Sequence, residues 1–503
     1  MYGIGSKKNI NKVALYFIIF IFSILGYLGY LLFIHYFNIN KEHDYMIIYL
    51  LSWLGILLGL YVLFSWYKLT ESIFSLYTIF MLFFFLFNYG QPLMWALGIH
   101  QADEIGQSKL YTLGRATTGS IIYTQILTLI SIIMFHLGAV FCYKPKKHTE
   151  KSENNLSFSI DAQQTSKIIF NICLILSFIV IPITFYNSID DLIYARNHGY
   201  QALYYDENRS SFAMFRLLQY MFFPCLVGLL VGSKYKRNVR YLVYTIFLVY
   251  LVINLLAGER GNWVYYLVIL IFMSHNFFKR IKWKRAITYT FIGILFLYII
   301  DAIVALRNTG ITTENVLKSL SLENSPIIST VFEMGSSMQP SLVLIQYGWD
   351  IWPYSNSYIN SILGVVSSEI FTILDIPFNT LSSWFSQDYL GISYGAGFSI
   401  IAEPLINFGP VISPLFMVVL GYIIASLTFL DKNMGINNYP LRVFFTVTTM
   451  SALIEIVRNH SHFTVKSWFF GVLIIYALVL MVRGLLKNQI NVQTAKVKKS
   501  TIE

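Results

Sequence analysis

The chain has 503 residues, 56% of them hydrophobic, and its 12% of charged residues compares with about 25% in a soluble domain. Its mean hydropathy is +0.60. The apolar residues form blocks of roughly 20, the length that crosses a hydrocarbon core of about 30 Å, which excludes a string of soluble domains. The net charge of +11 gathers in short loops, a distribution typical of membrane proteins and not of nucleic-acid binding.

Twelve apolar segments predict an all-α bundle of about twelve transmembrane helices. The first segment follows Lys7, Lys8 and Lys12. It is too long for a signal-peptide core and lacks a small-residue cleavage site, so we interpret it as a span. The predicted spans are residues 13–37, 45–67, 72–97, 119–143, 168–186, 212–232, 241–257, 262–278, 286–304, 411–430, 441–457 and 466–485.

Basic residues are concentrated in alternate loops, among them 144–167, and in the tail 486–503. The positive-inside rule therefore predicts cytoplasmic termini, a cytoplasmic loop at 144–167 and a single membrane domain over the whole chain. The opposite side carries the longer segments, above all 305–410 between the ninth and tenth spans. Within it, residues 359–374 are apolar but interrupted by Glu369, which suggests a re-entrant or interfacial helix. Function is expected on this outer side, because loops carry sites.

Neither the cysteines nor the histidines predict a metal site. Cys142, Cys173 and Cys225 fall in or beside apolar blocks with no CxxC spacing, which supports neither a zinc site nor a disulfide framework. His460 and His462 lie in one loop, and two ligands are too few for a metal. A hydrogen-bonding or proton-transferring role for one of them is the better interpretation.

Ionisable residues at membrane depth are costly and indicate function. The tight turn 258–261 contains Glu259 and Arg260, which we interpret as an anion-binding arginine held by its neighbouring carboxylate. The alternative is a snorkelling interfacial pair. Arg307 follows Asp301 at the end of the ninth span and could hold a phosphate bidentately, or could be an ordinary boundary residue.

Two more sites follow in the last third of the chain. Glu455 and Arg458 stand three residues apart, so they would share a helix face, either as an ion pair or with Arg458 binding a ligand. Glu403 is a lone carboxylate in an apolar stretch between Gly397 and Gly409. Burial of a carboxylate costs free energy unless the group is paired. Glu403 is therefore either a general base or the buried partner of an arginine.

Three short segments carry a family resemblance: 257–263, 333–335 with the aromatic loop through Tyr358, and 395–399 leading to Glu403 and 407–409. With these segments the sequence resembles the Wzy-type O-antigen and capsular polysaccharide polymerases of bacteria. The resemblance covers the membrane core, and its motifs are confined to these stretches. Two residues after Glu403, where that family often has an aromatic residue, this chain has Leu405.

The resemblance implies a GT-C-like helical fold in the bacterial cytoplasmic membrane. It also implies a substrate, oligosaccharide repeat units on undecaprenyl diphosphate, and transfer of the growing glycan from its lipid diphosphate to an incoming lipid-linked unit. No cofactor and no essential metal are implied. Partners would be this lipid-linked oligosaccharide and membrane lipid, and could include a flippase and a chain-length regulator, with no nucleic acid.

We combine this implication with the charged residues to assign expected roles. Arginines would stabilise the charge of the leaving diphosphate, and one carboxylate or histidine would take the proton from the attacking hydroxyl. The expected residues are Arg260, Arg307 and Arg458 on the diphosphate, Glu403 or His460 as the base, and Glu259, Glu455 and Asn407 in support.

Three alternatives stay open on the sequence alone. A flippase or other transporter of lipid-linked oligosaccharide would share the span count and basic loops. The long outer loop and the lack of matching halves argue against it. An O-antigen ligase-like transferase would differ only in its acceptor, and a scaffold protein would leave the outer arginines unexplained.

Overall fold

The structure is a computed structural model that describes residues 3–101, 104–106, 109–143, 155–198, 213–257, 261–282, 284–285, 287–288, 291, 293, 325–392, 394–431 and 434–486. The described chain divides into two compact units. The first unit comprises Met1–Pro145, Lys279–Leu427 and Ile454–Phe463. The second comprises Lys146–Phe278, Thr428–Leu453 and Thr464–Glu503.

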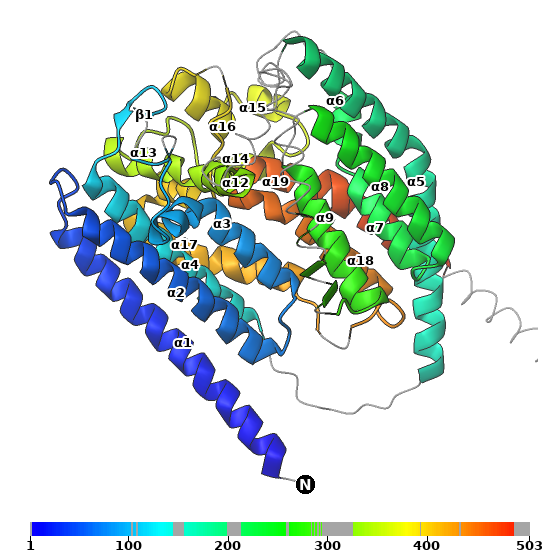
Figure 1. The fold of residues 1–503 in the computed structure, drawn as a ribbon. Helices are drawn as coiled ribbons and strands as arrows, with labels where there is room; N and C mark the ends of the chain where they lie inside the picture. The colour runs from blue at the N-terminus through cyan, green and yellow to red at the C-terminus, as the bar shows by residue number, and fades with distance from the viewer. Residues whose placement is uncertain are drawn as a thin grey trace, which may run out of the picture. The chain divides into compact units, whose positions relative to one another are not determined.

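The first unit contains four long N-terminal helices, a short hairpin, a series of short helices and one long bent helix (Figure 1). Helix α2 packs against both α3 and α4, and α1 packs against α4. The elements are α1 (Gly3–Tyr36), α2 (Tyr45–Thr70), α3 (Leu76–Ala96), β1 (Lys109–Leu110), β2 (Gly114–Arg115), α4 (Thr118–Cys142), α12 (Pro326–Gly335), η4 (Ser336–Met338), α13 (Gln339–Tyr347), α14 (Ser357–Leu363), α15 (Glu369–Ile373), α16 (Leu381–Ser383), η5 (Trp384–Tyr389), α17 (Ala402–Thr428) and η6 (Ile454–Val457).

The second unit is built on α5, which packs along α7 and α8. Gly228 of α7 permits this close approach, because an added Cβ would lie 2.1 Å from Cys173 Sγ. The elements are α5 (Asn155–His198), α6 (Ala213–Gln219), α7 (Phe222–Gly232), α8 (Arg237–Ala257), α9 (Asn262–Met273), η2 (Ser274–Phe278), α18 (Pro440–Leu453), η7 (Phe469–Leu473) and α19 (Ser461–Trp468), whose first three residues belong to the first unit.

Ten helices in the described part of the chain are long and apolar enough to cross a membrane, and each coincides with a predicted span. This confirms the all-α, polytopic membrane class. Helices suit this setting because all their backbone groups are paired within the segment. Three of them begin at side-chain caps, where Asp44, Ser75 and Thr117 accept backbone N–H groups of the first turns of α2, α3 and α4.

Several predicted boundaries differ from the structure. Helix α5 begins at Asn155, inside the predicted loop 144–167, and residues 144–154 lie outside the described residues. The predicted span 262–278 is an apolar helix that is shorter than the ten candidate spans. Most of the predicted span 286–304 lies outside the described residues. The segment 359–374 contains two short helices, α14 and α15, because a turn at 364–366 separates them. The tail from 487 onward is not described.

Helix α3 crosses α12 at a pair of glycines. An added Cβ at Gly335 would lie 2.4 Å from Gln91 N, and one at Gly90 would lie 2.9 Å from Val331 O. Gln91 Nε2 also donates to Phe332 O at 3.0 Å. The backbones meet at van der Waals distance here, which only glycine permits, and this explains the glycine of the 333–335 segment.

Helices α4 and α17 cross in the same way. An added Cβ at Gly138 would lie 1.9 Å from Val418 O, and one at Gly421 would lie 2.0 Å from Phe135 O. Small residues on both partners allow such contact in membrane helices, where close packing replaces the hydrophobic effect between helices. This crossing fixes the helix that carries Glu403.

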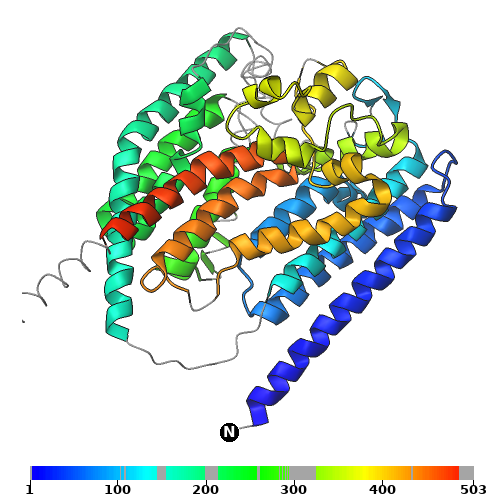
Figure 2. The same cartoon turned by 180° about the vertical axis from the view of Figure 1, so that it is seen from behind.

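Helix α17 begins nine residues before the predicted span at 411 and bends at Gly409, which has φ 71° and ψ 175° (Figure 2). The following Pro410 cannot donate a backbone hydrogen bond. Two tyrosines of α1 satisfy carbonyls at the bend: Tyr30 Oη donates to Pro410 O at 3.0 Å and Tyr27 Oη to Val411 O at 2.8 Å. Gly409 thus marks the bend in the helix that carries Glu403.

We expect Gly138→Ala to lower stability by about 1–3 kcal/mol, because the new methyl group must push the α17 backbone away. A thermal melt of the purified protein in detergent measures the effect. Gly29→Ala on α1 is the matched control, since nothing lies within 4 Å of its added Cβ. Equal melting temperatures for the two variants would contradict the described crossing.

Candidate active site

Glu403 lies in the first turn of α17 and is 0% exposed. Its carboxylate accepts three hydrogen bonds. Ser357 Oγ donates to Oε1 at 2.7 Å, Ser461 Oγ donates to Oε1 at 2.6 Å, and the Ser461 backbone N–H donates to Oε2 at 2.7 Å. Both oxygens are therefore engaged by serines of α14 and α19, and among the described residues no arginine contacts them.

Asn407 lies one helical turn after Glu403 and extends the same network. Its Nδ2 donates to Glu403 O at 2.7 Å and to Ser357 Oγ at 2.8 Å, while its Oδ1 accepts from Ser357 N at 2.8 Å. The side chain thus fixes the first residue of α14 through both backbone and hydroxyl. The predicted supporting residue Asn407 is placed directly beside Glu403.

Glu403 also stands at the beginning of α19. The Ser461 N–H that it accepts is one of the groups at a helix N-terminus that have no partner within the helix. A carboxylate there is further stabilised by the helix dipole. Ser361 Oγ lies 2.7 Å from Ser461 Oγ and donates to Ser357 O at 2.6 Å, which closes the network between α14 and α19.

His460 immediately precedes this junction. It is 1% exposed, and neither ring nitrogen has a hydrogen-bond partner among the described residues. The ring stacks on His462 with 6.2 Å between centroids and meets Phe463 edge-on at 5.3 Å. Burial, with a smaller contribution from His462, lowers the pKa of His460 to about 3. The imidazole is therefore neutral at physiological pH and able to accept a proton or hydrogen bond.

Arg458 lies two residues before His460 on the exposed side of the same turn. Its Cζ lies 5.6 Å from the centroid of the Phe87 ring of α3, a cation–π distance. The Arg458 carbonyl accepts from Phe398 N at 3.3 Å, so the segment after Gly397 (φ 68°) is held against it. Asn88 Nδ2 donates to Val457 O at 3.0 Å and secures the same turn from α3.

Glu455 lies in the 3₁₀ turn η6, where its carbonyl accepts from Arg458 N and Asn459 N, both at 3.1 Å. The turn follows α18, which ends at Leu453. Side chains three residues apart lie on the same side of a 3₁₀ turn, so the predicted shared face of Glu455 and Arg458 stays a prediction. The turn leads to Ser461, which donates to the Glu403 carboxylate.

The structure brings together Glu403, Asn407, His460 and, on the adjoining turn, Arg458. Arg260, Glu259 and Arg307 lie outside the described residues, so their predicted diphosphate role stays a prediction. In the described ranges, no group of three or more His, Cys, Asp or Glu side chains could hold a metal ion.

Sequence reasoning missed the serines that surround Glu403. Ser357 and Ser461 are 46 and 58 positions from it in the chain. One signal was available: Ser461 stands between two histidines at the start of a helix, a position where a buried carboxylate can cap the N-terminus.

The family model for O-antigen polysaccharide polymerase Wzy matches residues 10–489. The chain belongs to this family. The resemblance carried by the three motif segments is thereby confirmed, and the chain is a multi-pass membrane polymerase that builds O-antigen-type polysaccharide. No curated protein and no solved structure matches the chain, so the GT-C-like architecture stays a prediction.

We expect Glu403→Ala to destabilise this polymerase by about 2–5 kcal/mol, because it leaves a cavity and three donors without a buried partner. Glu403→Gln should cost less. Its amide oxygen can accept from Ser461 N–H, and the serine hydroxyls can rotate to accept from its NH₂ group.

In thermal melts, the melting temperature should fall in the order wild type, Glu403→Gln, Glu403→Ala. Glu333→Ala, at an exposed carboxylate of α12, is the control. An alanine variant that melts with the wild type would argue against a stabilising role for the carboxylate.

Proposed function

We propose that this polymerase joins oligosaccharide repeat units carried on undecaprenyl diphosphate, at the outer face of the bacterial cytoplasmic membrane, with both termini in the cytoplasm. The growing glycan moves from its own lipid diphosphate to the sugar of an incoming lipid-linked unit. The observation that carries the proposal is the family match over residues 10–489. The basic loops support the orientation.

The reaction needs little beyond positioning and charge stabilisation. A hydroxyl oxygen of the acceptor sugar attacks the anomeric carbon of the donor glycan and forms the new glycosidic bond. The bond from that carbon to the diphosphate oxygen breaks, and the diphosphate leaves with the electron pair. The hydroxyl proton passes to a base. The leaving group is already weakly basic, so its stabilisation by cations lowers the barrier further.

Arg458, together with Arg260 and Arg307, would bind the diphosphate. A guanidinium presents a rigid fork of donors that matches phosphate oxygens, and it keeps its charge at any working pH. Arg458 is exposed, and its guanidinium lies over the Phe87 ring of α3. In this proposal arginines supply the electrostatic role that a divalent ion has in other transferases.

His460 is the proposed base, and Glu403 the residue that positions it. Both nitrogens of His460 are without a described hydrogen-bond partner, whereas both oxygens of Glu403 are engaged. Glu403 holds Ser461, the residue bonded directly to His460, and so orients the histidine. An arriving diphosphate favours the charged imidazolium and raises the His460 pKa when substrate is bound.

The proposed activity is tested with the purified protein, lipid-linked repeat units and a gel that separates glycans by length. We expect a ladder of polymers in the presence of EDTA and without any sugar nucleotide. A heat-inactivated sample is the control. Movement of lipid-linked units across vesicles without a ladder would favour a flippase, and abolition by EDTA with rescue by magnesium would contradict the metal-free mechanism.

We expect His460→Gln to reduce the polymerisation rate by about 10²–10⁴-fold, the usual contribution of a general base. Because the active form is the neutral imidazole and its pKa is lowered to about 3, the wild-type kcat/KM should show no loss near pH 6.5 due to this residue. A steady fall of kcat/KM between pH 7 and 6 that disappears in His460→Gln would contradict the described burial. A near-normal rate in His460→Gln would remove the assignment as base.

A further inference from the structure

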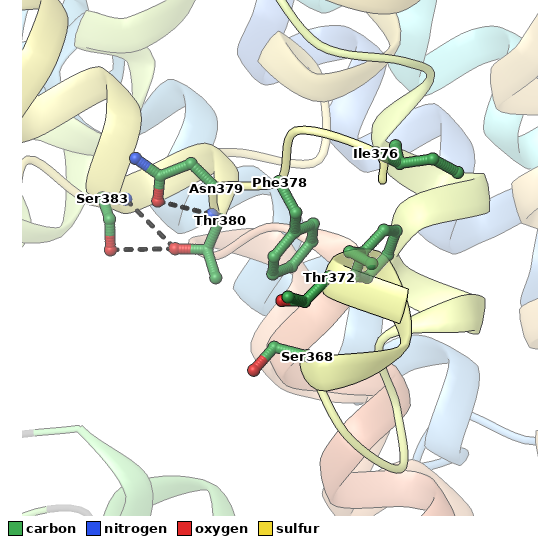
Figure 3. A pocket seen from close by; sticks show the side chains of 8 residues that line it. Ser368, Thr372, Ile376, Phe378, Asn379, Thr380 and Ser383 are labelled. Atoms are coloured by element: carbon green, nitrogen blue, oxygen red, sulfur yellow. Dashed lines mark hydrogen bonds between the residues drawn. The ribbon is translucent and has the colours of Figure 1, made fainter. Parts of the chain in front are cut away.

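A pocket of about 380 Å³ lies in the first unit between α15 and the segment that leads into α16 (Figure 3). Its volume is within the roughly 300–1,000 Å³ typical of small-molecule sites. The proposed reaction does not use this pocket. Three of its eight lining residues are apolar: Phe371, Ile376 and Phe378.

The two phenylalanines form an aromatic wall. Phe371 and Phe378 stack with 4.1 Å between ring centroids and 4° between planes. Phe371 is 2% exposed, so it supports the wall from behind, while Phe378 is half-buried and lines the pocket. Because Phe371 holds one face of the Phe378 ring, the other face can contact a ligand with little further loss of side-chain entropy.

The other five lining residues are neutral and polar. Ser368 is the residue just before α15 and Thr372 lies on α15 four residues later, so they share a face. Figure 3 shows their hydroxyls on the same side as Phe378. Both residues are exposed, so their hydroxyls are accessible to a ligand. Each can donate one hydrogen bond to a ligand and accept from it.

The opposite wall is rigid. Thr380 caps α16, with its Oγ1 accepting from Ser383 N at 3.4 Å and donating to Ser383 Oγ at 2.8 Å. Asn379 Oδ1 accepts from Thr380 N at 2.7 Å, and its Nδ2 donates to Asp388 Oδ2 at 3.0 Å. Asp388 does not line the pocket, but it is the only charged residue among these hydrogen-bonded groups. Its negative charge disfavours an anionic ligand.

The pocket adjoins the candidate active site. Phe378 meets the ring of His462 with 5.9 Å between centroids. Gly364 allows both rings to come close, because an added Cβ there would lie 3.0 Å from Phe371 and 3.2 Å from His462. The aromatic wall is therefore in contact with the histidine pair that includes the proposed base.

We infer that this pocket binds one neutral pyranose residue of the oligosaccharide, next to the reacting sugar. The inference rests on the proposed function and adds a glycan subsite to it. A pyranose has an apolar C–H face that packs on an aromatic ring and a rim of hydroxyls that match Ser368 and Thr372. The lining contains no cation, so a diphosphate or an acidic sugar is not matched, and five polar side chains do not suit a lipid tail.

The test is a binding measurement on the full chain in detergent. The probe is the repeat-unit oligosaccharide released from its lipid by mild acid, titrated by calorimetry. We expect Phe378→Leu to weaken binding about five- to tenfold through loss of the ring face, and Thr372→Val about three- to tenfold through loss of one hydroxyl. Phe378→Tyr, which keeps the ring, should bind within about twofold of wild type.

The matched control is Ile373→Ala, on the same helix but 81% exposed and outside the lining. It should bind as wild type does, and inorganic pyrophosphate should bind equally to every variant. Wild-type affinity in both Phe378→Leu and Thr372→Val, or no binding of the oligosaccharide by the wild type, would overturn the inference.

A polymerisation assay on the same proteins separates this inference from the proposed function. Pocket-dependent binding without any polymer ladder would reject the polymerase mechanism and keep the subsite. A normal ladder with an unchanged KM in Phe378→Leu would reject the subsite and keep the polymerase.

Discussion

The buried carboxylate of Glu403 determines how the site is assembled. Three segments far apart in the chain, the starts of α14, α17 and α19, meet at this single group. An uncompensated carboxylate in such a place would cost several kcal/mol. Here Oε1 accepts from α14 and α19, and Oε2 accepts from α19. The carboxylate therefore favours the arrangement in which all three segments meet.

Close backbone contacts place this network within the membrane helices. The Gly138–Gly421 and Gly90–Gly335 crossings bring α4 to α17 and α3 to α12 without side chains between them. Helix α3 then holds η6 through Asn88, and η6 leads to His460. His462 in turn contacts Phe378, which stacks on Phe371 to form the aromatic wall of the pocket. A rigid scaffold thus supports loops that carry the polar groups.

The sequence predicted the membrane helices well, since an apolar block of about 20 residues has few other stable conformations. It also predicted a partner for Glu403, because a lone carboxylate in an apolar stretch is costly unless paired. The motif segment 407–409 pointed to Asn407, which the structure places beside that carboxylate. The partners themselves were not predictable. Serines are common and carry no distinctive pattern, and their separation in the chain hides the contact. The shift from α-helix to 3₁₀ turn at 454–457 was equally hidden, because the turn packs against α3, a helix far away in the sequence.

The break at Gly409 has a mechanical consequence for the polymerase. The helical hydrogen bonds of α17 are interrupted there by a residue with positive φ and a proline, so the parts before and after Gly409 are not one continuous helix. A bilayer that thickens or thins tilts the long spans it contains. The part after Gly409 packs on α4, whereas the part that carries Glu403 is held by hydrogen bonds to α14 and α19. The span and the residue at the site therefore have separate supports.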